Sequence, residues 1–148
     1  KKVLLSAPGK GGDVRTIVMG ANDDEAKDLD MLSNASCTTN SLVPVAQVLD
    51  KEFGIENGFM STIHAYTNDQ NLLDNMHKKP RRGRSAAINM VITSTGAGKA
   101  VTKVVPSLLG KLTANAVRVP TPNGSLAIMH LNLKKETSLE EVNRVTQH

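Results

Sequence analysis

The sequence is short of cysteine, aromatic residues and long apolar runs. Its 148 residues include one cysteine, one tyrosine, two phenylalanines and no tryptophan. A single cysteine excludes a disulfide within the chain and is typical of a reducing compartment, so we expect a cytoplasmic protein. So few aromatic side chains leave almost no surface on which nucleic-acid bases can stack, which disfavours nucleic acid as a partner.

Long apolar segments are also missing. No apolar run approaches the roughly 20 residues that a membrane-spanning helix needs, and we therefore expect no contact with a membrane. The apolar run that follows Lys1 and Lys2 is too short for a secretory signal peptide. A hydrophobic content of 39% is sufficient for about one domain with an aliphatic core.

Positive charge is concentrated in the segment from Lys78 to Arg84, KKPRRGR. It holds five of the 18 lysines and arginines, so the rest of the chain, with 14 acidic residues, is close to neutral. A general nucleic-acid binder spreads its charge more widely. Pro80 and Gly83 predict an irregular loop, and the arginine forks favour phosphate capture. A solvated surface loop, a localisation signal and a nucleic-acid patch are the alternatives.

The single cysteine, Cys37, lies in a run of small polar residues, SNASCTTNS, at positions 33–41. An apolar pattern with helical spacing follows at once, at Leu42, Val45, Ala46, Leu49 and Phe53. Because serine, threonine and asparagine cap helices, the sequence predicts Cys37 at or just before a helix N-terminus, where a thiolate is favoured. A buried structural cysteine is the alternative. Pro44 predicts an irregular first turn.

His64 is the candidate partner of this cysteine. It lies near the end of a predicted strand at residues 59–66 and shares a strand face with Thr62 and Tyr66. A cysteine nucleophile needs a base, and imidazole is the commonest one. The alternative is a hydrogen-bonded structural histidine.

Residues 93–99, TSTGAGK, lie between a predicted strand at 87–92 and a predicted helix that ends before Pro106. They do not form a P-loop, because Thr93 replaces the required glycine and Ala100 the required hydroxyl. Hydroxyl and N–H groups at a helix start still predict phosphate binding. Arg118, in an alternating segment at 115–120, is either a second anion ligand or a surface strand residue.

The remaining pattern consists of short elements at both ends of the chain. We expect a buried strand at 3–5, a loop at 10–13, a strand at 16–19 and a turn or short helix at 22–30, with no evident partner for either strand. We expect a turn at 121–124, a last strand at 126–133, and a helix opened by a capping box at Ser138 and Glu141. We expect no metal site.

Five segments together resemble the phosphorylating glyceraldehyde-3-phosphate dehydrogenases, in the order of that family. They are SNASCTTN (33–40), HAYTNDQ (64–70), RRGR (81–84), STGAGKA (94–100) and RVPTPN (118–123). The resemblance implies an α/β protein, with an α+β catalytic domain whose mixed or antiparallel sheet is backed by helices. It implies that residues 1–36 end a Rossmann-like NAD(P)-binding domain and that residues 37–148 form a catalytic domain truncated at its C-terminal end. The chain is then an internal piece of a longer enzyme, inactive by itself.

The resemblance also implies a role for each candidate residue. Cys37 attacks the aldehyde of glyceraldehyde 3-phosphate, His64 is the general base, hydride passes to NAD or NADP, and inorganic phosphate cleaves the thioester. Thr67 and Arg118 bind the substrate phosphate. The attacking phosphate is bound by Ser36, Thr38, Thr95, Gly96 and an arginine of the basic segment, Arg82 first and Arg84 next. Ser6 matches a position near the cofactor, and the full-length enzyme is expected to be a homotetramer.

Three positions depart from the family pattern. Ser41 replaces a usual cysteine, and Gly124 and Ile128 replace a commoner valine and aspartate. The last two departures bear on packing or subunit contacts. Three alternative functions are open on separate grounds: a dehydrogenase for erythrose 4-phosphate or another sugar-phosphate aldehyde, a Cys–His hydrolase, whose usual third residue the chain does not offer, and a non-enzymatic module that binds anions or nucleic acid through the segment from Lys78 to Arg84.

Overall fold

The computed structural model describes residues 1–11 and 14–147, so two residues of the loop expected at 10–13, and His148, lie outside the described residues. The chain divides into two compact units. The first consists of Lys1–Gly58, Ala97–Leu112 and Leu131–His148, and the second of Phe59–Gly96 and Thr113–His130.

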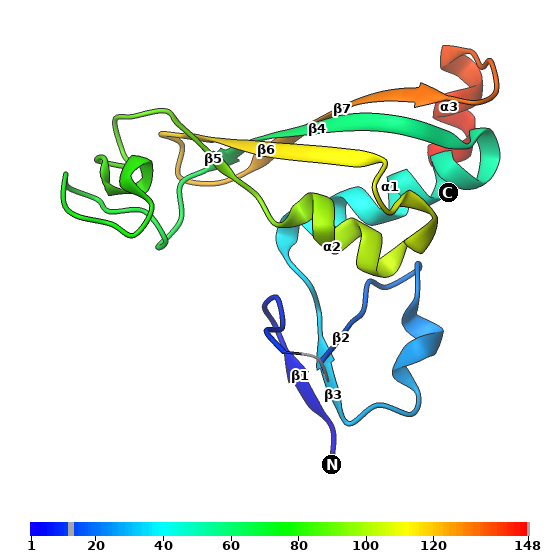
Figure 1. Cartoon of the computed structure of the whole chain (residues 1–148), viewed down its shortest axis with the longest axis horizontal. Coiled ribbons are helices and arrows are strands. Elements are labelled where there is room, and N and C mark those ends of the chain that lie inside the picture. Colours follow the sequence, from blue (N-terminus) through cyan, green and yellow to red (C-terminus); the bar gives the residue numbers. More distant parts are fainter. Residues whose placement is uncertain (12–13, 148) are drawn as a thin grey trace. The chain divides into compact units, whose positions relative to one another are not determined.

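The first unit contains a small parallel sheet near the N-terminus (Figure 1). Strands β1 (Val3–Leu5) and β2 (Arg15–Thr16) pair on either side of β3 (Met31–Ser33). Strand β3 was not predicted, and it is the partner that the first two strands lacked. The prediction that residues 3–5 are buried is wrong: Leu4 is 67% exposed, because β1 is an edge strand paired on one side only.

The strand predicted at 16–19 is shorter in the structure, where β2 covers Arg15–Thr16, and the buried side chain of Asn22 holds the segment that follows. Ile17 and Val18 are buried yet lie beyond the strand, which ends at Thr16. The Asn22 side chain accepts from Val18 N (2.9 Å) and donates to Thr16 O (3.0 Å), which turns the chain away from the sheet. A 3₁₀ helix, η1 (Asp23–Ala26), follows, in agreement with the predicted turn or short helix.

The first unit also contains the longer helices of the chain and another 3₁₀ helix. They are α1 (Cys37–Phe53), α2 (Ala97–Val104), the 3₁₀ helix η3 (Pro106–Leu108) and α3 (Leu139–Thr146). The α1 side chains that bury its apolar face are Leu42, Val43, Ala46, Leu49 and Phe53, and α2 lies beside α1 (Figure 1). Contrary to expectation, α1 runs through Pro44 without interruption, because the proline removes only one backbone donor.

Asp50 fastens the C-terminal end of α1. One carboxylate oxygen accepts from Ile55 N (2.9 Å) and the other from the Ser107 hydroxyl (2.6 Å). Burial raises the pKa of the Asp50 carboxyl, but these two hydrogen bonds and the charges of Lys111 and Lys134 outweigh it, so the pKa lies below its usual value. The ionised carboxylate therefore stabilises the turn from α1 into the next strand.

The larger sheet has the strand order β5-β6-β4-β7. Its strands are β4 (Ile55–Ala65), β5 (Val91–Ser94), β6 (Leu112–Val119) and β7 (Ser125–Leu133), and β5 pairs antiparallel with β6. Because β4 lies between β6 and β7, the two later strands do not form a hairpin. A parallel sheet, a second sheet with an antiparallel pair, and several helices confirm the predicted α/β class.

Two predicted elements of the second unit were wrong. The strand expected at 87–92 begins only at Val91, because Asn89 donates from its side chain to Ser85 O (2.9 Å) and holds the preceding residues in a turn. The basic segment is not irregular, because Pro80–Gly83 forms a 3₁₀ helix, η2. Proline is favourable at a helix start, since an N–H at that position would have no partner within the helix.

Among the described residues, no helix has the length and apolar character to cross a membrane.

Candidate active site

Cys37 is the first residue of α1, as the sequence predicted. Ser36 is the N-cap, and its hydroxyl accepts from Thr39 N at 3.1 Å and lies 2.8 Å from the Thr39 hydroxyl. Cys37 is exposed, and its sulfur lies 3.9 Å from the hydroxyl of Thr38. An exposed thiol at the positive end of a 17-residue helix, flanked by hydroxyls, has the surroundings of a reactive cysteine rather than a structural one.

The turn that leads into Cys37 is strained and held by side chains. Ala35 is buried and has φ of 57°, a left-handed conformation that costs energy for any residue with a Cβ. Asn40 donates from its side-chain amide to Asn34 O (2.8 Å) and Ser36 O (3.0 Å), one carbonyl on each side of Ala35. Asn40 was not among the predicted site residues, although a short polar side chain four residues after the N-cap can bond back to the N-cap carbonyl.

Ser33, at the end of β3, also stabilises the turn before Cys37 through its side-chain hydroxyl. Its buried hydroxyl accepts from Gly9 N (3.0 Å) and Ala35 N (3.2 Å) and donates to Ala7 O (2.6 Å). This fixes the segment after β1, in which Ser6 directly follows the strand and is exposed. Ser6 thus lies at the carboxyl end of a parallel strand, the edge at which such sheets bind ligands.

His64 lies next to last in β4 and contacts Arg118 of β6. Arg118 Nη1 lies 2.8 Å from His64 Nδ1 and donates to Ala65 O at 3.0 Å. Ala65 O itself lies 2.7 Å from His64 Nδ1. Both side chains are half-buried, so Arg118 is not a solvated surface residue. Thr67 is exposed two residues after the end of β4, and its carbonyl accepts from Gln70 N (2.9 Å).

Arg82 joins three segments of the second unit. Its Nε donates to the Thr93 hydroxyl (2.9 Å), Nη2 donates to Ser94 O (3.0 Å), and Nη1 forms an ion pair with Asp69. Its side chain is only 11% exposed. The guanidinium is thereby held at the end of β5, next in sequence to Thr95.

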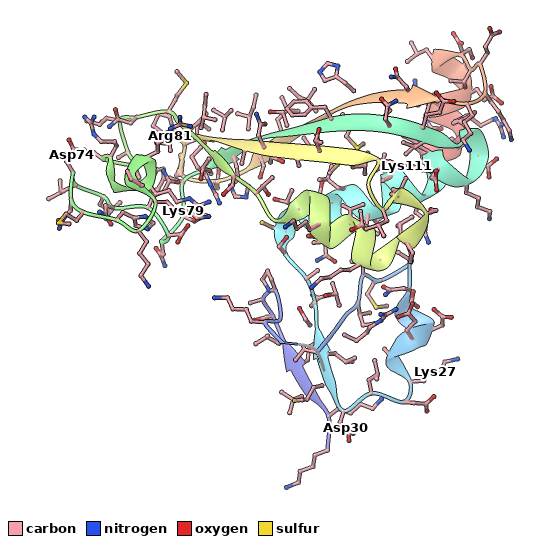
Figure 2. The ribbon with its side chains drawn as sticks, in the orientation of Figure 1. Lys27, Asp30, Asp74, Lys79, Arg81 and Lys111 are labelled. Atoms are coloured by element: carbon pink, nitrogen blue, oxygen red, sulfur yellow. The ribbon has the colours of Figure 1, made fainter. Side chains whose placement is uncertain are left out.

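Arg84 has different surroundings. It donates to Asp74 at 3.1 Å and is well exposed. The N–H of Ser85 and the side chain of Arg84 hold the pKa of the Asp74 carboxyl below its usual value. Figure 2 labels Asp74 together with Lys79 and Arg81 of the basic segment. Lys79 donates to the Ser94 hydroxyl (3.1 Å), so the basic segment is tied to the end of β5.

Thr95 and Gly96 directly precede α2, as the sequence predicted. Thr95 is half-buried and Gly96 exposed, and space around the Gly96 Cα is open. Gly124, one of the departures from the family pattern, has φ of 82°, which glycine adopts without strain, and its carbonyl accepts from Ala65 N (3.1 Å). In the described part of the chain, no group of three or more His, Cys, Asp or Glu side chains has the arrangement of a metal site.

Comparison with known proteins identifies close relatives. Residues 36–148 match the family described as "Glyceraldehyde 3-phosphate dehydrogenase, C-terminal domain". The chain is 57% identical over 143 residues to the glyceraldehyde-3-phosphate dehydrogenase-like protein of Pseudomonas aeruginosa (strain UCBPP-PA14), covering 96% of this chain and 31% of that protein. It is 55% identical over 145 residues to glyceraldehyde-3-phosphate dehydrogenase 1 of Bacillus subtilis (strain 168), covering 97% and 43%. The chain therefore spans less than half the length of these relatives.

Proposed function

The chain belongs to the glyceraldehyde 3-phosphate dehydrogenase family, and on that premise we propose that it is part of an enzyme that oxidises glyceraldehyde 3-phosphate and phosphorylates the product to 1,3-bisphosphoglycerate. The observation that carries the proposal is Cys37, an exposed thiol at the capped start of α1 within the family's signature sequence. Its sulfur adds to the aldehyde carbon and forms a thiohemiacetal. His64 takes the hydroxyl proton as hydride leaves the same carbon, and the product is a thioester.

A nicotinamide cofactor, NAD or NADP, accepts that hydride when it is bound. Of the residues in this chain, Ser6 is the one proposed to contact the cofactor. Its exposed position at the carboxyl end of β1, in a parallel sheet, fits a nucleotide ligand. We further propose that residues 1–36 end the cofactor-binding domain and that residues 37–148 belong to the catalytic domain. The confinement of the parallel sheet to residues 3–33 supports this division.

The two phosphate groups require two sets of donors. For the substrate phosphate we propose Thr67 and Arg118. For the phosphate that attacks the thioester we propose Ser36, Thr38, Thr95 and Gly96, together with Arg82. Arg82 is preferred to Arg84 because its Nη2 bonds the residue next to Thr95, whereas Arg84 pairs with Asp74. On family grounds alone we propose a cytoplasmic homotetramer for the whole protein.

The direct test is the formation of reduced cofactor, followed by absorbance, when the full-length protein is given glyceraldehyde 3-phosphate, inorganic phosphate and either NAD or NADP. Cys37→Ser is expected to abolish turnover, and Ser41→Ala, on the exposed surface of the same helix, to leave it unchanged. Erythrose 4-phosphate in place of the triose distinguishes the related sugar-phosphate dehydrogenases. Absence of turnover with every aldehyde, together with nucleic-acid binding that survives Cys37→Ser, would instead support the binding-module alternative.

A further inference from the structure

The turn before β7 contains an asparagine followed by a glycine, Asn123-Gly124. Gly124 replaces the commoner valine of the family pattern, so it is this replacement that creates the dipeptide. The backbone nitrogen of a glycine can attack the side-chain carbonyl of a preceding asparagine, because no Cβ obstructs the approach. The same dipeptide occurs at Asn57-Gly58, inside β4. The chain thus offers the same local chemistry in two different surroundings.

Asn123 lies in an exposed turn. Residues 120–127 are all exposed, and residues 121–124 belong to no strand or helix. Gly124 has a left-handed φ, and no other part of the chain lies within 4 Å of where a Cβ would be. In the described part of the chain, neither the Asn123 side chain nor the Gly124 N–H is hydrogen-bonded. The peptide between the two residues can therefore rotate toward the asparagine side chain.

Asn57-Gly58 is held by the larger sheet instead. Gly58 N donates to Lys111 O at 2.9 Å, and the Asn57 side chain accepts from the Asn132 amide at 2.8 Å. Attack at this site requires both hydrogen bonds to break and the backbone to leave its strand conformation, which costs free energy before any reaction begins. The strand therefore protects Asn57.

We propose that Asn123 is a site of spontaneous deamidation, with water as the co-reactant. Gly124 N bonds to the side-chain Cγ of Asn123 and closes a succinimide ring. The bond from Cγ to the amide nitrogen breaks, and ammonia leaves with the proton that Gly124 N has lost. Water then opens the ring at either carbonyl, which gives aspartate or isoaspartate. No atom is oxidised or reduced.

Isoaspartate adds a methylene group to the main chain beside a contact of β4. The Gly124 carbonyl accepts from Ala65 N at 3.1 Å, and Ala65 is the last residue of β4 and follows His64. A longer main chain directly before Gly124 displaces this carbonyl, so the strand end that carries His64 loses a main-chain hydrogen bond. A fall in turnover follows, and this last step alone rests on the proposed function.

The test of the site is incubation of the full-length protein at neutral and mildly alkaline pH. Peptides are analysed by liquid chromatography and mass spectrometry, which separate asparagine, aspartate and isoaspartate. Asn123 is expected to react about tenfold faster than Asn57 or more, because only Asn57 must first break hydrogen bonds. In guanidinium-unfolded protein the two rates should be similar. Intact Asn123 after prolonged incubation, or equal rates in the folded protein, would overturn the proposal.

Two variants separate the longer main chain from the new charge. Asn123→Gln is the unreactive control, because glutamine would have to close a larger ring, which forms far more slowly. Freshly prepared Asn123→Asp carries the charge on an unaltered main chain. The amide of Ala65 is expected to exchange its hydrogen about fivefold faster in the isoaspartate form, a factor that corresponds to one typical hydrogen bond. Fresh wild type, incubated Asn123→Gln and fresh Asn123→Asp should agree with one another.

Unchanged exchange at Ala65 in protein that contains isoaspartate would refute the effect on β4. Turnover of glyceraldehyde 3-phosphate is expected to fall in proportion to the isoaspartate content, and Asn123→Gln to keep its turnover through the incubation. Full turnover of protein rich in isoaspartate would contradict the effect on the strand end of His64. Absence of turnover in fresh protein would refute the proposed function, and the peptide analysis and hydrogen exchange would still decide the deamidation site.

Discussion

Asn40→Ala removes the side chain that holds the turn in front of Cys37. The amide makes two hydrogen bonds, to Asn34 O (2.8 Å) and Ser36 O (3.0 Å), on either side of the left-handed Ala35. A typical hydrogen bond contributes about 0.5–1.5 kcal/mol net, so losing both costs about 2 kcal/mol. That corresponds to a roughly 30-fold fall in the ratio of folded to unfolded protein. Because the strained turn leads directly into Cys37, the proposed nucleophile, we also expect slower alkylation of this thiol.

The free energy of unfolding is measured by urea denaturation, with an unchanged slope as the sign that only stability has changed. Alkylation of Cys37 by iodoacetamide is timed under native conditions. The matched control is Gln47→Ala on the same helix, which loses a single amide hydrogen bond, to Ala21 O at 3.2 Å, and is expected to cost about half as much. Equal losses in the two variants, with alkylation of Cys37 unaffected by Asn40→Ala, would refute the argument that Asn40 holds this turn.

Three further variants test other parts of the structure. Asp50→Asn is expected to lower stability at pH values above the unfolded-state pKa of about 3.9. The difference from wild type should disappear as the pH falls through the lower pKa of this carboxyl in the folded state, and a urea series against pH checks this. Arg82→Lys is expected to raise KM for phosphate about tenfold or more, whereas Arg84→Lys is expected to raise it less than twofold. Equal effects of the two variants in phosphate titrations would contradict the preference for Arg82 as the phosphate ligand. Gly83→Ala brings its Cβ into a clash with the backbone oxygen of Asn75, so thermal unfolding should show a clear loss of stability. An unchanged unfolding temperature would contradict the described packing.

Local patterns determined much of what could be predicted. The polar run before a helical apolar pattern was sufficient to place Cys37 at the start of α1 with Ser36 as its cap, because capping depends only on neighbouring residues. For the same reason Ser138 caps α3 as expected, accepting from Glu141 N. The predicted strand at 126–133 differs from β7 by one residue.

Errors occurred where distant residues decide. Strand β3 has only three residues and no alternation to mark it. It forms because β1 and β2 pair with it, and the paired residues are 28 and 17 positions apart in the sequence, respectively. The strand at 87–92 was predicted because these residues are mostly apolar. Its first residues are held in a turn by Asn89, and the ladder with β6 starts at Val91.

The family and the capped start of α1 could be predicted from the sequence alone, because each depends on short runs of neighbouring residues. Which distant side chains contact one another was visible only in the folded chain. Arg118 is 54 residues from His64 and meets it at 2.8 Å because β6 lies beside β4. Arg82 is 13 residues from Asp69 and forms an ion pair with it, while the same guanidinium bonds the Thr93 hydroxyl in β5. Such contacts depend on strand order and register, which no spacing along the chain specifies.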